Sequence, residues 1–174
     1  MNDQNIRTEN YAKQYGALLG IISVAFGLML FSVDLHDQNE ISVFIVSLTI
    51  IIGMIGLAQF NFRKDNGGCL SLNQATKIGL GMSAILGVVN VLYFLFLTHV
   101  LDPEMMNRVL ELKMNEFLDQ NPEASIETIE QVRSIQEIFS GPLISSSLFI
   151  TGSLFIGFIA SLITGLILKR NRPE

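Results

Sequence analysis

Charged residues are missing from four long stretches of the sequence, and this absence is the strongest signal in the chain. Four apolar runs contain no Asp, Glu, Lys or Arg: Tyr15–Val33, Ile41–Phe60, Ile78–Leu101 and Leu143–Leu168. Each run has about 20 residues or more, the length that a helix needs to cross a bilayer core of roughly 30 Å. A helix of a soluble bundle normally keeps a charged stripe on the face that meets solvent. The runs therefore predict an all-α membrane protein with four transmembrane helices.

Other residue types are scarce, and each scarcity excludes something. With only one cysteine, the chain cannot form an intrachain disulfide. No Trp is present, so a full aromatic belt is excluded and Tyr11, Tyr15 and Tyr93 are the candidate interface anchors. No proline lies inside an apolar run, which argues against the broken helices of many transporters.

Motifs for catalysis, cofactors and metals are also missing. No Ser, Cys or His has the sequence context of a nucleophile–base pair, and Gly67-Gly68 does not continue as a phosphate-binding loop. His36 and His99 lie near acidic residues at the same expected interface, but they lack the spacing of metal ligands. We therefore expect no enzyme activity, no cofactor and no metal site, and nucleic acid is not an expected partner.

Basic residues are distributed unevenly between the segments that separate the runs. Counted on alternate sides, eight Lys and Arg lie on the side of the two termini and the 61–77 loop, against three on the other side. The positive-inside rule places the richer side in the cytoplasm. Both termini are then cytoplasmic, and segment 102–142 is extracytoplasmic. The outer side holds twelve of the sixteen acidic residues, so it attracts cations or basic partners.

Segment 102–142 is the only long polar stretch, and its pattern predicts an extracytoplasmic insert made of two amphipathic helices. Asp102-Pro103-Glu104 is suited to begin the first helix, with Asp102 as the N-cap and Pro103 as the first helical residue. This helix is expected to end near Leu118, before a helix-breaking stretch that contains Pro122.

The second helix of the insert is expected to begin near Asn121 or at Ser125 and to end near Phe139. Both helices carry an apolar stripe: Met106, Leu110, Met114 and Phe117 on the first, and Ile126, Ile129, Val132, Ile135 and Ile138 on the second. An antiparallel hairpin would bury one stripe against the other. The alternatives are that the helices lie on the outer leaflet or form a groove for a partner.

Small residues recur at helical spacing on one face of each run, as they do at membrane helix interfaces. They are Gly16, Gly20, Ser23 and Gly27; Thr49, Gly53 and Gly56; Gly79, Ser83 and Gly87; and Ser153, Gly157, Ser161 and Gly165. These stripes predict close packing, either inside a four-helix bundle or in a homo-oligomer. Asn90, the most polar side chain near the centre of a run, requires a hydrogen-bond partner on the fourth run or in a second copy.

The loop between the second and third runs carries local signals. Asn66-Gly67-Gly68 is typical of a turn. Ser71 or Asn73 is a candidate N-cap for the helix that leads into the third run. Cys69 lies in this loop near the inner interface, where palmitoylation or redox chemistry is an open alternative to an incidental cysteine.

Several short motifs are shared with a known family. They are the Gly-rich first run, Arg63-Lys64-Asp65, Leu72-Asn73-Gln74-Ala75 before Gly79, Leu101-Asp102-Pro103-Glu104 and a basic C-terminal end. With these motifs the chain resembles the bacterial domain-of-unknown-function family numbered 4199 over nearly its whole length. The resemblance implies a small four-span protein of the bacterial inner membrane. It implies no site, because the family has no established activity or catalytic residues.

These features favour a non-enzymatic interaction or accessory protein. Its external hairpin would contact an extracytoplasmic protein partner or the outer leaflet. The alternative is a small oligomeric transporter or channel in which Asn90 faces the pathway. The sequence does not identify a partner, a substrate or an oligomeric state.

Overall fold

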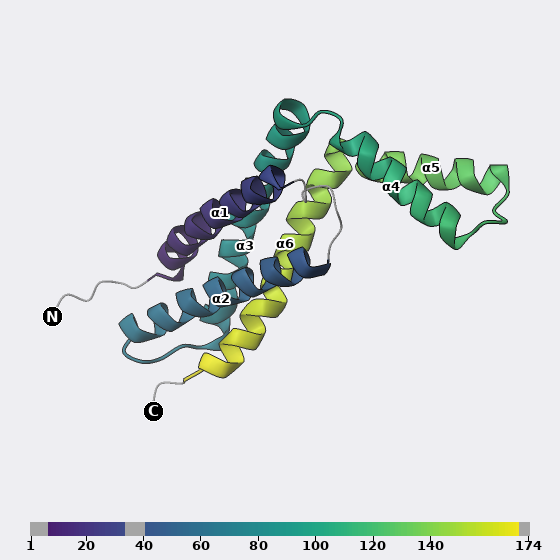
Figure 1. Cartoon of the computed structure of the whole chain (residues 1–174). Helices are drawn as coiled ribbons and strands as arrows, with labels where there is room; N and C mark the ends of the chain where they lie inside the picture. The colour runs from purple at the N-terminus through teal and green to yellow at the C-terminus, as the bar shows by residue number, and fades with distance from the viewer. Residues whose placement is uncertain (1–6, 34–40, 171–174) are drawn as a thin grey trace.

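The computed structural model describes residues 7–33 and 41–170, and the regular elements within these ranges are helices (Figure 1). In chain order they are α1 (Thr8–Ser32), α2 (Ile41–Asp65), α3 (Leu72–Phe96), the π-helical turn η1 (Leu97–Leu101), α4 (Met105–Gln120), α5 (Ile126–Ser140) and α6 (Pro142–Leu168). In the described ranges, α1, α2, α6 and the continuous α3–η1 helix are the four that are long and apolar enough to cross a membrane. The predicted all-α architecture with four spans is confirmed.

Three of the spanning helices extend beyond the predicted apolar runs. α1 begins at Thr8 rather than Tyr15, α2 continues to Asp65, and α3 begins at Leu72 rather than Ile78. The extensions are polar, and the backbone hydrogen bonds of a helix continue where the hydrocarbon ends. All three extensions lie at the same end of the molecule, which contains the α2–α3 loop.

α3 and α6 form the centre of the bundle. α3 packs against α6 on one side and against α1 on the other, while α2 packs mainly against α6. A Cβ atom added to Gly79 would overlap the side chain of Ser161, and one added to Gly157 would overlap Ser83. The predicted stripes of the third and fourth spans therefore lie directly against each other, at a separation that only small residues permit.

The stripe of α1 packs against larger residues of α3. Added Cβ atoms on Gly16 and Gly20 would lie 2.9 Å from Ile85 Cδ1 and 3.0 Å from Val89 Cγ2. On α2, an added Cβ at Gly53 would have no described atom within 4 Å. An added Cβ at Gly56 of the same stripe would lie 3.5 Å from Thr164 Cγ2, so the α2 stripe is packed at one position and open at another. A homo-oligomer stays a prediction.

Contacts between distant segments close the end of the bundle that contains the α2–α3 loop. Leu70 and Arg170 exchange two backbone hydrogen bonds, with N···O distances of 2.9 and 3.0 Å. The Tyr11 hydroxyl donates to the Asp65 carboxylate, and the Tyr11 ring meets Phe62 edge-on with centroids 5.3 Å apart. The start of α1, the α2–α3 loop and the end of α6 are thus held together.

The α2–α3 loop follows its predicted turn chemistry. Gly67 and Gly68 have φ angles of 66° and 81°, in the left-handed region that glycine adopts without steric cost. The Ser71 hydroxyl accepts a 3.2 Å bond from the Gln74 N–H, and Gln74 Oε1 accepts a 2.9 Å bond from the Ser71 N–H. This reciprocal capping box satisfies two backbone donors at the start of α3. The predicted turn and the predicted Ser71 cap are both confirmed.

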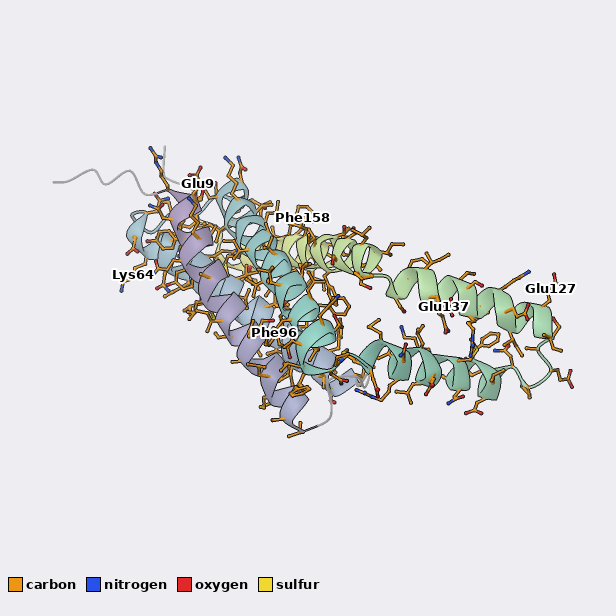
Figure 2. The ribbon with its side chains drawn as sticks, turned by 90° about the horizontal axis from the view of Figure 1, so that it is seen from above. Glu9, Lys64, Phe96, Glu127, Glu137 and Phe158 are labelled. Atoms are coloured by element: carbon orange, nitrogen blue, oxygen red, sulfur yellow. The ribbon has the colours of Figure 1, made fainter. Side chains whose placement is uncertain are left out.

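α4 and α5 form a hairpin that projects from the opposite end of the bundle (Figures 1 and 2). Figure 2 shows Glu127 near the hairpin tip, far from Glu9 and Lys64 at the other end of the molecule. α5 begins at one of its two predicted starts, because the Ser125 hydroxyl accepts a 3.2 Å bond from the Thr128 N–H and caps the helix.

The predicted start of α4 is wrong. The helix begins at Met105, and its N-cap is Glu104, which makes no side-chain capping bond. Asp102 instead accepts hydrogen bonds from both terminal nitrogens of Arg108, one of them at 3.1 Å. A bidentate guanidinium–carboxylate pair is stronger than a single bond from a backbone N–H, so the pair displaces the expected cap. Pro103 therefore lies in the turn before the helix.

Candidate functional site

The hairpin leaves much of its apolar surface uncovered. α5, whose residues are all described, contains no buried residue, and in the fully described α4 only Met114 is buried. Ile126 is 78% exposed, Ile135 is 54% exposed and Ile138 is 58% exposed. The expectation that the hairpin buries one stripe against the other is therefore wrong for most of α5.

The spacing of the α5 stripe explains this exposure. Its apolar residues recur every three positions, and three residues turn a helix by about 300°, so successive side chains shift by about 60° around the axis. Ile129 and Val132, near the middle of the stripe, are half-buried. Ile126 and Ile138, at its two ends, have rotated into exposed positions. α5 therefore packs through only part of its stripe, and the remainder is a free apolar surface.

Acidic residues surround this surface. Segment 102–142 carries nine acidic and three basic residues. Arg108 is paired with Asp102, whereas Lys113 and Arg133 are exposed and form no ion pair within the described chain. The side chains of Glu127 and Glu137 are exposed on α5 (Figure 2). The hairpin therefore combines uncovered apolar side chains with a net negative charge.

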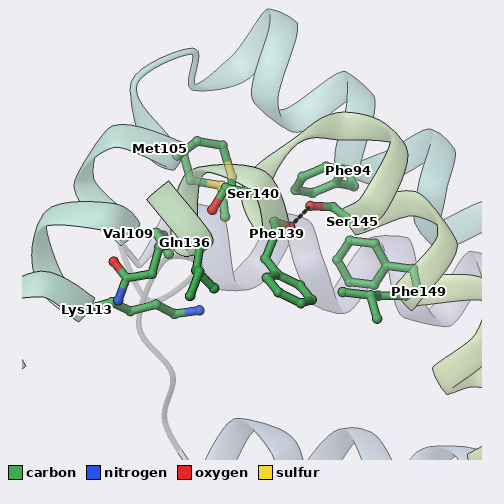
Figure 3. Close-up of a pocket in the computed structure, with 12 residues that line it drawn as sticks. Phe94, Met105, Val109, Lys113, Gln136, Phe139, Ser140, Ser145 and Phe149 are labelled. Atoms are coloured by element: carbon green, nitrogen blue, oxygen red, sulfur yellow. Dashed lines mark hydrogen bonds between the residues drawn. The ribbon is translucent and has the colours of Figure 1, made fainter. Parts of the chain in front are cut away.

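A pocket of about 750 Å³ lies where the hairpin joins the bundle (Figure 3). Most of its lining is apolar, and the lining residues come from four helices. They include Phe94 of α3, Val109 and Lys113 of α4, Phe139 of α5 and Phe149 of α6. The pocket thus lies at the junction where the base of the projecting hairpin meets α3 and α6.

One end of the pocket is aromatic and the other is charged. At the bundle end, the rings of Phe94 and Phe149 have centroids 5.1 Å apart. Lys113, the one cation among the described lining residues, extends from the opposite end in Figure 3. The Ser145 hydroxyl donates a 3.0 Å bond to the Phe139 carbonyl, which ties α6 to the end of α5. This bond spans the turn between α5 and α6, and both of its residues line the pocket.

Two amides join the spanning helices. Asn90 finds its partner on the first span rather than the expected fourth span, because Ser23 Oγ donates to Asn90 Oδ1 at 2.9 Å. Gln59 is fully buried on α2, and its Nε2 donates to the carbonyl oxygens of Ala75 at 3.3 Å and Ser161 at 3.1 Å. Sequence reasoning missed Gln59, although an amide inside an apolar run was the available signal.

The remaining polar residues singled out in the sequence do not form a common site. His99 Nδ1 lies 3.0 Å from the Leu95 carbonyl oxygen, and His36 lies outside the described residues. Cys69 is partly exposed, with its Sγ 3.7 Å from the Gly67 carbonyl oxygen. Within residues 7–33 and 41–170, no group of three or more His, Cys, Asp or Glu is placed to hold a metal ion.

Four apolar spans and a hairpin between the third and fourth define a multi-pass membrane protein built on a helical bundle. The chain belongs to the DUF4199 family, described as a protein of unknown function, whose family model matches residues 14–170. This match includes the hairpin and confirms the resemblance that the sequence motifs indicated. Neither the curated proteins nor the solved structures contain a significant match to this chain.

Proposed function

We propose that this protein is a non-enzymatic accessory protein of the membrane, and that its α4–α5 hairpin binds a protein partner. The observation that carries the proposal is the free apolar surface of α5, where Ile126 and Ile138, neither of which lines the junction pocket, are each more than half exposed. Uncovered apolar side chains on a polar, amphipathic helix are typical of a helix that docks into a partner's groove.

The charge of the hairpin favours a protein over a lipid surface as the occupant. Exposed acidic residues such as Glu127 and Glu137 flank the apolar side chains of α5. An acidic helix is repelled by anionic headgroups, whereas a protein groove with a basic rim complements it. The partner therefore presents an apolar groove bordered by Lys or Arg.

The hairpin belongs on the extracytoplasmic side of the bacterial inner membrane in this proposal. The opposite end of the bundle carries most of the basic residues, among them Arg63, Lys64, Lys77, Lys169 and Arg170. The positive-inside rule assigns this basic end to the cytoplasm, together with both termini. The inner membrane itself is what the family resemblance implies.

The transporter alternative gains no support from the polar contacts. Asn90 is engaged by Ser23 on the neighbouring span, and no observation connects it to a pathway. A role of Asn90 in transport therefore stays a prediction from the sequence.

Photocrosslinking in cells tests the proposal. A photoreactive amino acid at Ser134, which is exposed on α5, should give an adduct of one discrete protein mass. Ile138→Ser should lower its yield at least about fivefold, because it removes an apolar anchor. Leu112→Ser is the matched control, since it removes a 52% exposed side chain of α4 outside the α5 stripe. Its adduct should match that of the parent protein.

Two results would overturn the partner proposal. One is adduct formation with lipid alone, and the other is a protein adduct whose yield is equal in Ile138→Ser and Leu112→Ser. Co-purification from detergent, with and without residues 104–140, provides a coarser check. Identical partner profiles for the two proteins would also contradict the proposal.

A further inference from the structure

We propose that the pocket between the hairpin and the bundle binds one phospholipid of the surrounding bilayer. An acyl chain of the lipid occupies the aromatic end near Phe94 and Phe149, and its phosphate meets Lys113. This inference goes beyond the proposed function, because it requires neither a protein partner nor a particular orientation in the membrane.

The size and lining of the pocket suit a hydrocarbon chain. Its volume of about 750 Å³ lies within the range of small-molecule sites, which is roughly 300–1,000 Å³. Phe94, Val109, Phe139 and Phe149 contribute apolar side chains from four different helices. An apolar cavity of this size loses stabilising contacts when it is empty, and an acyl chain restores them.

The wall of the pocket is continuous with the lipid-facing surface of the bundle. Leu148 and Phe149 line the pocket, and they are 53% and 39% exposed on α6. α6 is one of the four helices long enough to span the membrane. A ligand therefore reaches the pocket from the bilayer, where phospholipids are the abundant molecules with two ends of opposite polarity.

Lys113 gives the pocket a charged end that suits a phosphate. It is exposed and forms no ion pair with any described residue, although the hairpin around it is predominantly acidic. The other two basic residues of the hairpin do not line this pocket. Arg108 pairs with Asp102, and Arg133 faces a separate, smaller cavity. A phosphate beside Lys113 forms a charge-assisted hydrogen bond that no protein group supplies.

Photoactivatable lipids in bilayer nanodiscs test the assignment. Two probes carry the same diazirine-labelled acyl chains, one as a phospholipid and one as a diacylglycerol that lacks the phosphate. The full-length protein should be labelled at pocket residues such as Phe94 and Phe149 roughly fivefold more by the phospholipid. Lys113→Gln should reduce this ratio to about one, because it removes the cation that recognises the phosphate.

Matched variants separate the lysine from general charge and from folding. Arg133→Gln removes the same charge from the same hairpin outside the pocket, so it should keep the parent ratio. Val109→Trp fills the cavity and should lower labelling of the pocket by both probes. Circular dichroism and thermal melting confirm that each variant folds. Because Lys113 is exposed, Lys113→Gln keeps the test valid even if Val109→Trp does not fold.

Several results would overturn the lipid site. They are equal pocket labelling by the two probes, labelling confined to the outer faces of the spans, and equal loss of preference in Lys113→Gln and Arg133→Gln. A third probe, a diazirine fatty acid, distinguishes the source of the negative charge, and pocket labelling by this probe alone would exclude the phospholipid. A negative result of the lipid labelling does not contradict the partner proposal, because that proposal is tested by the Ser134 crosslink.

Discussion

At the scale of single residues, two glycine–serine contacts set the distance between the central helices. Gly79 of α3 lies against Ser161 of α6, and Gly157 of α6 lies against Ser83 of α3. The Ser83 hydroxyl donates to the Gly79 carbonyl of its own helix at 2.9 Å, so it needs no partner across the interface. The helices can therefore approach closely without leaving a polar group unpaired, which is the requirement for packing in lipid.

Gly157→Ala tests this contact directly. The added Cβ would overlap Ser83, so α3 and α6 must separate, and we expect a loss of about 1–3 kcal/mol in the free energy of unfolding. Gly53→Ala is the matched control, because its added Cβ meets no described atom within 4 Å. Reversible unfolding in detergent micelles measures both variants. Equal stability of the two would show that α3 and α6 do not pack as described.

At the scale of secondary-structure elements, the bend between the third span and the hairpin is built from two adjacent features. The π-turn η1 ends where the Asp102 N–H donates to the Leu97 carbonyl at 2.7 Å. The Asp102 carboxylate then accepts hydrogen bonds from the Arg108 guanidinium in the first turn of α4. The same residue thus ends one helix through its backbone and fixes the next through its side chain.

Arg108→Gln should loosen this bend. Arg108 is 40% exposed and Asp102 is 14% exposed, so solvent partly screens the pair and we expect a loss of about 1 kcal/mol. Hydrogen exchange of the amides around Asp102 should then accelerate by about fivefold. Asp102→Asn should produce a similar change, and Arg133→Gln should produce none. Unchanged exchange in both Arg108→Gln and Asp102→Asn would contradict a fixing role for the pair.

The elements also show what the sequence can and cannot predict. The four spans, the Gly67-Gly68 turn and the Ser71 and Ser125 caps were predictable, because each depends on residues within one helical turn or on the length of an apolar run. The prediction that Asp102 caps α4 was wrong, because the Asp102 carboxylate pairs with Arg108 instead of accepting a backbone N–H at the start of the helix. The junction pocket was not predictable, since it depends on the angle between the hairpin and the bundle, which arises from contacts such as Ser145 with Phe139.

At the scale of the whole molecule, the two ends of the bundle differ in charge. The end with the α2–α3 loop gathers basic residues from α2, from α3 and from the residues that follow α6, and the hairpin end gathers acidic ones. Figure 2 shows this separation in the positions of Lys64 and Glu127. Such asymmetry along the long axis favours one orientation of the protein in the membrane over the other.

The single native cysteine provides a test of that orientation. Cys69 is partly exposed in the α2–α3 loop, which the proposed topology places in the cytoplasm. A membrane-impermeant maleimide should therefore label it in spheroplasts only after permeabilisation. In a Cys69→Ser background, Ser134→Cys on the hairpin should be labelled without permeabilisation. Labelling of Cys69 in intact spheroplasts, with Ser134→Cys protected, would reverse the proposed topology.

The central position of α6 has a consequence for how the protein is made. α3 leaves the ribosome before the hairpin and before α6, so its face around Gly79 and Ser83 lacks the α6 surface that covers it during that interval. The Leu70–Arg170 pairing, which joins the α2–α3 loop to the residues after α6, forms later still. The tightest contact of the bundle is thus among the last to assemble. If synthesis stops before α6, the small-residue face of α3 stays uncovered and is available to pack against other membrane helices.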